Sequence, residues 1–305
     1  MNLKAAAHQQ HVIDCRSPSG AHRMVVHEWG EPDNDQVLVC VHGLTRVGQD
    51  FQALAQRFSA THRVLAPDVV GRGASDWLVD PQHYVVAQYA QDMQEMAAQL
   101  NLPPVHWVGT SMGGLVAMML AGHPERSQLF PAMELRSLVL NDVGAVVSGA
   151  ALGRIGRYLG ADPYFQSVDE AESLVRKIFS GFGEHSDAQW RHLTQVVLHP
   201  DGEGFRFHYD PALSEPFRAA FSMVEGENPP DMDLWSLYDN LALPTLLMRG
   251  GDSDILTEDV ALAMTQRGPR ARLLTVPGVG HAPSLVRAGE IESILEWVTD
   301  LQVDT

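Results

Sequence analysis

The stretch Trp107-Val108-Gly109-Thr110-Ser111-Met112-Gly113-Gly114 places one serine between two glycines, at a point where one apolar segment gives way to another. Residues 104–108 before it predict a short buried strand, and residues 115–121 after it predict a buried helix that ends at Gly122. In such a G-x-S-x-G turn the serine backbone is strained and its hydroxyl points out of the sheet, while the glycines leave room for the neighbouring strand and helix. The stretch therefore predicts a nucleophile elbow with Ser111 at its tip.

Strand-like and helix-like segments alternate on both sides of this turn, which is typical of a mostly parallel sheet with helices on both faces. Two early strands, 11–16 and 22–29, are separated by a short Ser-Pro-Ser-Gly turn and predict an antiparallel hairpin. The parallel strands are expected at 37–41, 63–66, 104–108, 135–140, 243–249 and 271–276. Amphipathic or buried helices are expected between them, at 51–58, 84–100, 115–121, 257–268 and 291–301.

The regular alternation stops between about Gly144 and Asn240, where the chain becomes helix-like pieces rich in aromatic residues, with a loop at 199–204. We expect residues 1–143 and 241–305 to form the core domain and residues 144–240 to form an inserted helical cap. Some of its aromatic side chains must pack the cap and others could line a substrate pocket: Tyr158, Tyr164, Phe165, Phe179, Phe182, Trp190, Phe205, Phe207, Tyr209, Phe217 and Phe221.

Composition and charge narrow the classes of partner. The chain has 21 Lys and Arg against 38 Asp and Glu, a formal net charge of −17 that no run of like residues concentrates. Nucleic acid and anionic lipid both favour clustered basic residues, so neither is expected as a partner. Residues 1–10 lack a signal-peptide core, and no stretch approaches the length of a membrane-spanning helix. We expect a cytoplasmic protein in which Cys15 and Cys40 are free thiols, Cys40 within a buried strand.

A serine hydroxyl becomes nucleophilic near neutral pH only when a base takes its proton and an acid orients that base. Proteins with this elbow supply the three groups in the chain order serine, acid, histidine. Of the 14 histidines only His281 follows the acid candidates that come after the predicted strand at 243–249, and it lies in a loop directly after the last predicted strand. We therefore predict His281 as the base.

The acid is expected after the strand at 243–249, where Asp252 and Asp254 both occur. Asp254 is the preferred candidate because it leads into the apolar pair Ile255-Leu256, whereas Asp252 lies in the turn itself. A third candidate is Asp142, which follows the strand before, because some proteins of this architecture supply the acid from that position.

Two backbone amides must face the oxygen on which negative charge develops. The residue after the nucleophile, Met112, supplies one, and Leu44 is the expected second donor in the loop after the strand at 37–41. In the same loop His42 is interpreted as a hydrogen-bonding brace. Arg72, in an organised loop at 68–76, is interpreted as structural, because its Gly-x-Gly pattern lacks the helix that a dinucleotide-binding fingerprint requires.

These motifs together resemble the α/β-hydrolase superfamily over nearly the full length of the chain. The resemblance implies an eight-stranded, mostly parallel sheet flanked by helices, a helical cap after the sixth strand, an acyl-enzyme mechanism and no cofactor. Haloalkane dehalogenases and epoxide hydrolases carry aspartate at the elbow, so Ser111 argues against both. The residues that carry the resemblance to the superfamily are the elbow, His42-Gly43, Pro67-Asp68, Gly71-Arg72-Gly73 with Ser75, Asp254 and Gly280-His281.

The expected function is a serine hydrolase that cleaves carboxylic esters of small to medium, mostly apolar substrates through an acyl-enzyme intermediate. One alternative is a carbon-carbon bond hydrolase of the ring-fission-product type, and another is a non-catalytic ligand-binding protein on the same fold. The only partner expected is a small-molecule ester. No metal site is expected, because the acidic and histidine residues around 199–210 lack a ligand-spacing signature.

Overall fold

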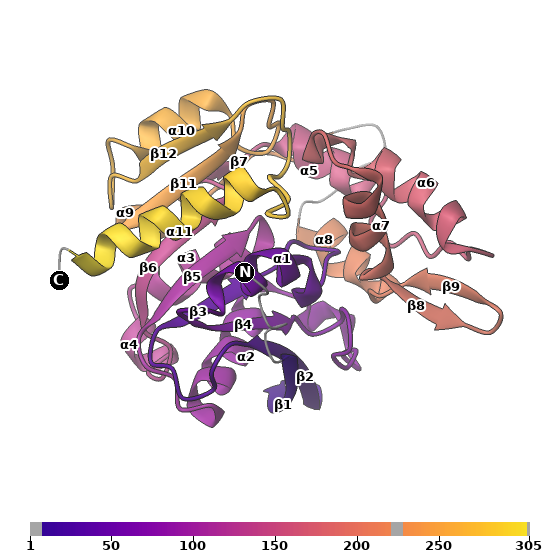
Figure 1. The fold of residues 1–305 in the computed structure, drawn as a ribbon, viewed down its shortest axis with the longest axis horizontal. Helices are drawn as coiled ribbons and strands as arrows, with labels where there is room; N and C mark the ends of the chain where they lie inside the picture. The colour runs from indigo at the N-terminus through magenta and orange to yellow at the C-terminus, as the bar shows by residue number, and fades with distance from the viewer. Residues whose placement is uncertain (1–7, 221–227, 304–305) are drawn as a thin grey trace.

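The computed structural model describes residues 8–220 and 228–303, and its core is an eight-stranded sheet in the order β1-β2-β4-β3-β5-β6-β11-β12 (Figure 1). β1 (His8–Ser17) and β2 (Gly20–Trp29) form the predicted antiparallel hairpin, and β2 pairs antiparallel with β4 (Arg63–Asp68). All other neighbouring strands of this sheet are parallel, which confirms the predicted fold class. These strands are β3 (Val37–Val41), β5 (Val105–Thr110), β6 (Leu135–Asn141), β11 (Thr245–Gly250) and β12 (Arg272–Val276).

Helices cover both faces of the sheet and bury its central strands. β3 and β11 are buried at every position, as expected of parallel strands that read as nearly continuous apolar runs. α1 (Gln52–Phe58) and α11 (Ala288–Val303) pack with one set of strand side chains. α2 (Val86–Gln99) and α3 (Met112–Gly122) pack with the other set. This packing on both faces fixes the positions of the carboxyl ends of the parallel strands. The remaining helical elements of the core are η1 (Gly48–Phe51), η2 (Pro81–His83), α4 (Arg126–Leu129) and α10 (Glu258–Met264).

The chain between β6 and β11, residues 142–244, is called the inserted segment here. Most of its helices lie together at one end of the molecule, beside the sheet, whereas α9 packs against α3 of the core (Figure 1). Two of these helices begin at side-chain caps: α6 begins after Ser167, whose hydroxyl accepts a hydrogen bond from the Glu170 backbone amide, and α7 begins with a capping box between Ser186 and Gln189. The elements are β7 (Val146–Val147), α5 (Gly149–Gly156), α6 (Val168–Ile178), η3 (Ser180–Phe182), α7 (Asp187–Gln195), β8 (Leu198–Asp201), β9 (Gly204–Phe207), η4 (Pro211–Leu213), α8 (Ser214–Ala220), β10 (Met232–Asp233) and α9 (Trp235–Asp239).

One local prediction for the inserted segment is wrong. The stretch 199–204, expected to be a loop, instead forms most of a β-hairpin in which β8 and β9 pair antiparallel. The turn contains Gly202 at φ 59°, a conformation that glycine adopts readily, and Asp201 pairs with Arg206 across the hairpin. Phe221, one of the aromatic residues singled out above, lies outside the described residues.

Cys15 and Cys40 are both free thiols; Cys40 is buried, as predicted, and Cys15 is buried as well. Within residues 8–220 and 228–303, no helix combines the length and the apolar character that crossing a bilayer requires.

Candidate active site

The elbow has the geometry that the sequence predicts. Ser111 lies between β5 and α3 with φ 51° and ψ −112°, which is strained for a residue other than glycine. A Cβ atom added to Gly113 would lie 2.1 Å from the carbonyl oxygen of Val41, and one added to Gly109 would lie 2.4 Å from the backbone of Gly113. Both glycines are therefore needed for α3 to approach the sheet, and this close approach holds Ser111 at the carboxyl end of β5.

His281 connects the serine to a carboxylate. The Ser111 hydroxyl lies 2.9 Å from His281 Nε2, and His281 Nδ1 lies 2.7 Å from Asp142 Oδ2. Because an ionised carboxylate can only accept, the imidazole donates from Nδ1 and its Nε2 is free to accept the serine proton. Three side chains from distant parts of the chain thus form one continuous hydrogen-bonded relay.

The prediction that Asp254 is the partner of His281 is wrong. The Asp254 carboxylate instead accepts two hydrogen bonds from the guanidinium of Arg154, at 2.7 and 2.8 Å, and its side chain is 48% exposed. Asp252 is exposed as well. The partner is Asp142, the alternative that follows β6, and its side chain is fully buried.

The last residue of β11 and the loop after it contribute hydrogen-bond donors to Asp142 in place of an acid. The Ser253 hydroxyl lies 2.6 Å from Asp142 Oδ2, and the Gly250 amide donates to Asp142 Oδ1 at 2.7 Å. With His281 they satisfy a buried carboxylate that would otherwise be costly to desolvate. Sequence reasoning missed Ser253; its place between the two rejected aspartates is the only signal that marks it.

Asn141 ties the loops of the site together. Its amide nitrogen donates to the Thr110 hydroxyl at 2.9 Å and to the Pro283 carbonyl at 2.8 Å. One side chain therefore links the strand before the serine to the loop that carries His281.

The loop after β3 lies directly against the serine. A Cβ added to Gly43 would lie 3.7 Å from Ser111 Cβ. Arg72 is buried and holds both predicted oxyanion residues: it donates to the Leu44 carbonyl at 2.8 Å and to Met112 Sδ at 3.3 Å. The structural role predicted for Arg72 can therefore be stated specifically: its guanidinium holds Leu44 and Met112 in place beside Ser111.

His42 braces the same loop. Its Nε2 accepts a hydrogen bond from the Val69 amide at 3.0 Å, and its Nδ1 lies 2.7 Å from the Gly43 carbonyl. Burial lowers the pKa of His42 to about 4, so the ring is neutral at physiological pH and can accept and donate at once. The predicted brace is confirmed.

Two cavities meet at Ser111. The first, called the apolar cavity, has a volume of about 260 Å³ and is lined by Ser111, Leu44 and Met112 together with aliphatic and aromatic side chains. The second, of about 60 Å³, is lined by Ser111, His281, Leu44 and two arginines. It shares five lining residues with a third cavity of about 240 Å³, and these two together are called the arginine chamber.

The predicted aromatic residues divide between these cavities and the core. Phe217 lines the apolar cavity, whereas Tyr158, Phe179, Phe182, Phe207 and Tyr209 line the arginine chamber. Phe165 and Trp190 are buried and line none of the three cavities in the part of the chain that the structure describes.

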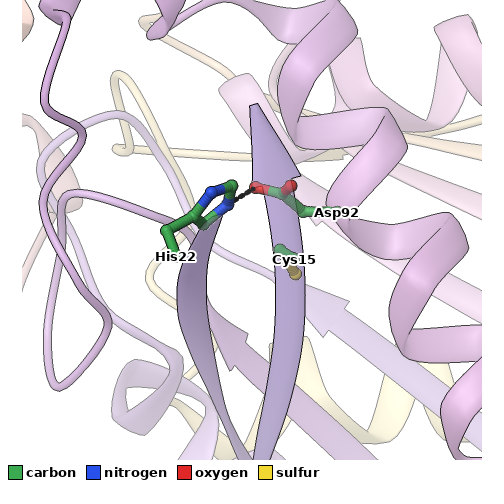
Figure 2. A group of neighbouring side chains, drawn as sticks. All are labelled: Cys15, His22 and Asp92. Carbon is green, nitrogen blue, oxygen red and sulfur yellow. Dashed lines mark hydrogen bonds and ion pairs between the residues drawn. The ribbon is translucent and has the colours of Figure 1, made fainter. Parts of the chain in front are cut away.

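A separate cluster joins Cys15 of β1, His22 of β2 and Asp92 of α2, with one atom from each within 4.8 Å of the others (Figure 2). His22 Nε2 lies 3.1 Å from Asp92 Oδ2, and Gln88 donates to the other carboxylate oxygen at 2.7 Å. Burial raises the pKa of the Cys15 thiol, so the sulfur stays protonated, unlike the thiolate that binds a metal. These contacts fit a buried hydrogen-bonded link between the hairpin and α2.

The sequence and the fold of this chain are similar to those of known proteins over nearly the whole chain. A family model described as the alpha/beta hydrolase family matches residues 38–292. A 3-hydroxybutyrate-oligomer hydrolase from Cupriavidus necator is 43% identical over 291 residues, which cover 94% of this chain and 96% of that protein. The crystal structure of an alpha/beta hydrolase from Novosphingobium aromaticivorans is similar with a TM-score of 0.80 and 33% identity, covering 96% of this chain and 98% of that one.

The crystal structure of a protein from Rickettsia typhi is similar with a TM-score of 0.85 and 27% identity, covering 96% of this chain and 99% of that one. The order of the strands, the turn at Ser111, the family model, the related sequence and the solved structures all indicate the same fold. The chain belongs to the α/β-hydrolase family and is a hydrolase.

Proposed function

We propose that the protein is a serine hydrolase of carboxylic esters, with Ser111 as nucleophile, His281 as general base and acid, and Asp142 as the carboxylate that orients His281. The observation that carries the proposal is the hydrogen-bonded relay, with 2.9 Å between Ser111 and His281 and 2.7 Å between His281 and Asp142. Such a relay activates a hydroxyl group that would be a poor nucleophile by itself.

In the proposed mechanism His281 Nε2 takes the Ser111 proton as Oγ attacks the ester carbonyl. The backbone amides of Leu44 and Met112 donate to the resulting oxyanion, and a donor of this kind is worth about 3 to 4 kcal/mol of barrier. His281 then gives the proton to the departing alcohol oxygen as the acyl carbon-oxygen bond breaks. Water, deprotonated by the same histidine, attacks the acyl-enzyme. His281 then returns this proton to Ser111 Oγ as the acyl carbon-Oγ bond breaks and the acid leaves. No cofactor takes part.

The proposed substrates are esters of 3-hydroxybutyrate and similar short hydroxy acids. The relative from Cupriavidus necator, named for 3-hydroxybutyrate oligomers, supports this choice because the similarity spans nearly both whole chains. The apolar cavity of about 260 Å³ suits a short aliphatic acyl group. We also propose that the inserted segment acts as the predicted cap, since it contributes lining residues to the cavities. The two buried free thiols support the proposed cytoplasmic location.

Hydrolysis of a linear 3-hydroxybutyrate trimer and of p-nitrophenyl butyrate tests this function. We expect both to be cleaved, and Ser111→Ala to lower kcat by about 10⁴-fold or more, as removal of such a nucleophile does elsewhere. Ser59→Ala, at a partly buried serine that follows α1 and lines none of these cavities, is the matched control. Undiminished turnover by Ser111→Ala would overturn the nucleophile assignment. Cleavage of a vinylogous diketone acid without cleavage of either ester would instead favour a carbon-carbon bond hydrolase.

A further inference from the structure

The two spaces that meet at Ser111 differ in chemical character. The apolar cavity has no charged lining residue among those the structure describes, and its polar groups are two tyrosines and Ser111 itself. The arginine chamber is lined by Arg46, Arg154 and Arg157, and within the described ranges no Asp or Glu lines it. In a chain with a net charge of −17, this is an unusual concentration of positive groups beside a reactive serine.

Arg46, which lines both cavities of the chamber, carries an unused hydrogen-bond donor among the described residues. It is 4% exposed, and its Nε and Nη2 donate to the Asp50 carboxylate at 2.7 and 2.6 Å. Nη2 also donates to the Leu193 carbonyl, and the guanidinium lies 4.8 Å from the centre of the Phe179 ring. Nη1 is buried and has no hydrogen-bond partner in the described part of the chain. Buried donors are rarely left unpaired, so this nitrogen marks a position for an oxygen atom of a ligand or of water.

Arg157 brings a further positive charge to the same chamber. It lines the larger of the two cavities and is exposed, and no acidic residue in residues 8–220 or 228–303 pairs with it. Arg154 differs, because Asp254 already neutralises it through two hydrogen bonds. Among the residues that the structure describes, the chamber therefore combines a cation without an acidic partner and a buried donor without an acceptor, which suits an anionic oxygen group.

The position of His281 indicates which part of an ester enters the chamber. His281 lines the chamber beside Ser111, whereas it does not line the apolar cavity. In the mechanism above His281 must hand its proton to the departing alcohol oxygen, so the alcohol part lies on the His281 side. The acyl part then occupies the apolar cavity.

We propose that the arginine chamber binds a carboxylate on the alcohol part of the ester, and that the preferred substrates are therefore esters whose leaving group is a hydroxy acid with a free carboxylate. Arg157 supplies the charge and Arg46 the buried donor. When the acyl carbon-oxygen bond breaks, the proton on His281 passes to the hydroxy acid oxygen and the hydroxy acid leaves from the chamber. This inference rests on the proposed ester hydrolysis and specifies its substrate.

Two substrates with the same scissile bond test the proposal: the linear dimer of 3-hydroxybutyrate and the methyl ester of that dimer, which lacks the charge. We expect the wild-type protein to cleave the free acid with a kcat/KM about tenfold higher than that of the methyl ester. Arg157→Gln should reduce this preference about five- to tenfold, chiefly through KM, because a charge-assisted hydrogen bond is lost. Arg157→Lys should restore part of it.

Arg272→Gln is the matched control, because it removes the same charge from an exposed position on β12 that lines none of these cavities. Binding of 3-hydroxybutyrate to Ser111→Ala, with and without Arg157→Gln, is a second measurement that needs no turnover; weaker binding with the second substitution supports the proposal. Equal cleavage of both dimers by the wild type, or an equal effect of the two Arg→Gln variants, would overturn it. Failure of the wild type to cleave either dimer or p-nitrophenyl butyrate would instead count against ester hydrolysis itself.

Discussion

At the scale of single residues, the outcome that matters most is which aspartate meets His281. Asp142, Asp252 and Asp254 all follow strands that end at the same edge of the sheet, so their positions in the chain do not separate them. Burial and hydrogen bonding do: Asp142 is fully buried and accepts from Ser253 and His281, whereas Asp254 is half-exposed and bonded to Arg154. A carboxylate that stabilises an imidazolium needs the first environment.

Substitutions of Asp142 and Asp254 distinguish the roles of these two residues. Asp142→Asn should lower kcat for p-nitrophenyl butyrate about 10³- to 10⁴-fold, because an amide in that place favours the wrong imidazole tautomer. Asp254→Asn should lower it less than tenfold. Steady-state kinetics of both variants, with thermal unfolding to confirm that each is folded, make the comparison. The reverse order of effects would restore Asp254 as the acid.

At the scale of elements, the elbow depends on how closely α3 approaches β3 and β5. Most helices and strands of the core could be predicted from the sequence, because parallel strands and amphipathic helices have distinct apolar patterns. It failed at β8, where Pro200 and a glycine-rich stretch favoured a loop. A two-stranded sheet has only edge strands, and a proline that cannot donate a hydrogen bond is tolerated there.

A pair of glycine substitutions tests the elbow as a packing element. Gly113→Ala should lower the free energy of unfolding by about 2 kcal/mol or more, because its methyl group would lie 2.1 Å from the Val41 carbonyl oxygen, a backbone atom with little freedom to move. Gly289→Ala in α11 is the matched control, since a methyl group there meets nothing within 4 Å. Urea denaturation measures both. Equal stability of the two variants would show that α3 can shift without cost.

At the scale of the whole molecule, several histidines are buried in the neutral state. Burial lowers the pKa of His42 and of His106 to about 4, whereas an unfolded histidine has a pKa near 6.5. The unfolded chain therefore binds more protons than the folded one between these values. The stability that the two rings contribute is present above about pH 6.5 and is lost as the pH falls toward 4.

The pH dependence of unfolding tests this linkage. Between pH 7.5 and pH 5 we expect the free energy of unfolding to fall by about 2 kcal/mol for each such histidine, at 1.36 kcal/mol per pKa unit. His106→Gln should make the fall smaller by about that amount, and His123→Gln, at a partly buried position, should not. Asp92 acts in the opposite direction, because burial raises its pKa, but it is the same in all three proteins. Equal falls for wild type and His106→Gln would contradict the prediction.

The sequence by itself determined the sheet, the elbow and the two groups that meet there, Ser111 and His281. These features depend on local patterns, such as the spacing of apolar residues, the glycines of a tight turn and the order of residues along the chain. The tertiary structure alone decided that Asp142 meets His281, that Ser253 and Arg72 hold their neighbours in place, and that arginines gather on one side of Ser111. Each of these contacts depends on which loops lie close together in the folded chain. Local sequence patterns do not show such contacts, because the side chains are far apart in the chain and meet only when the sheet brings the ends of their strands together.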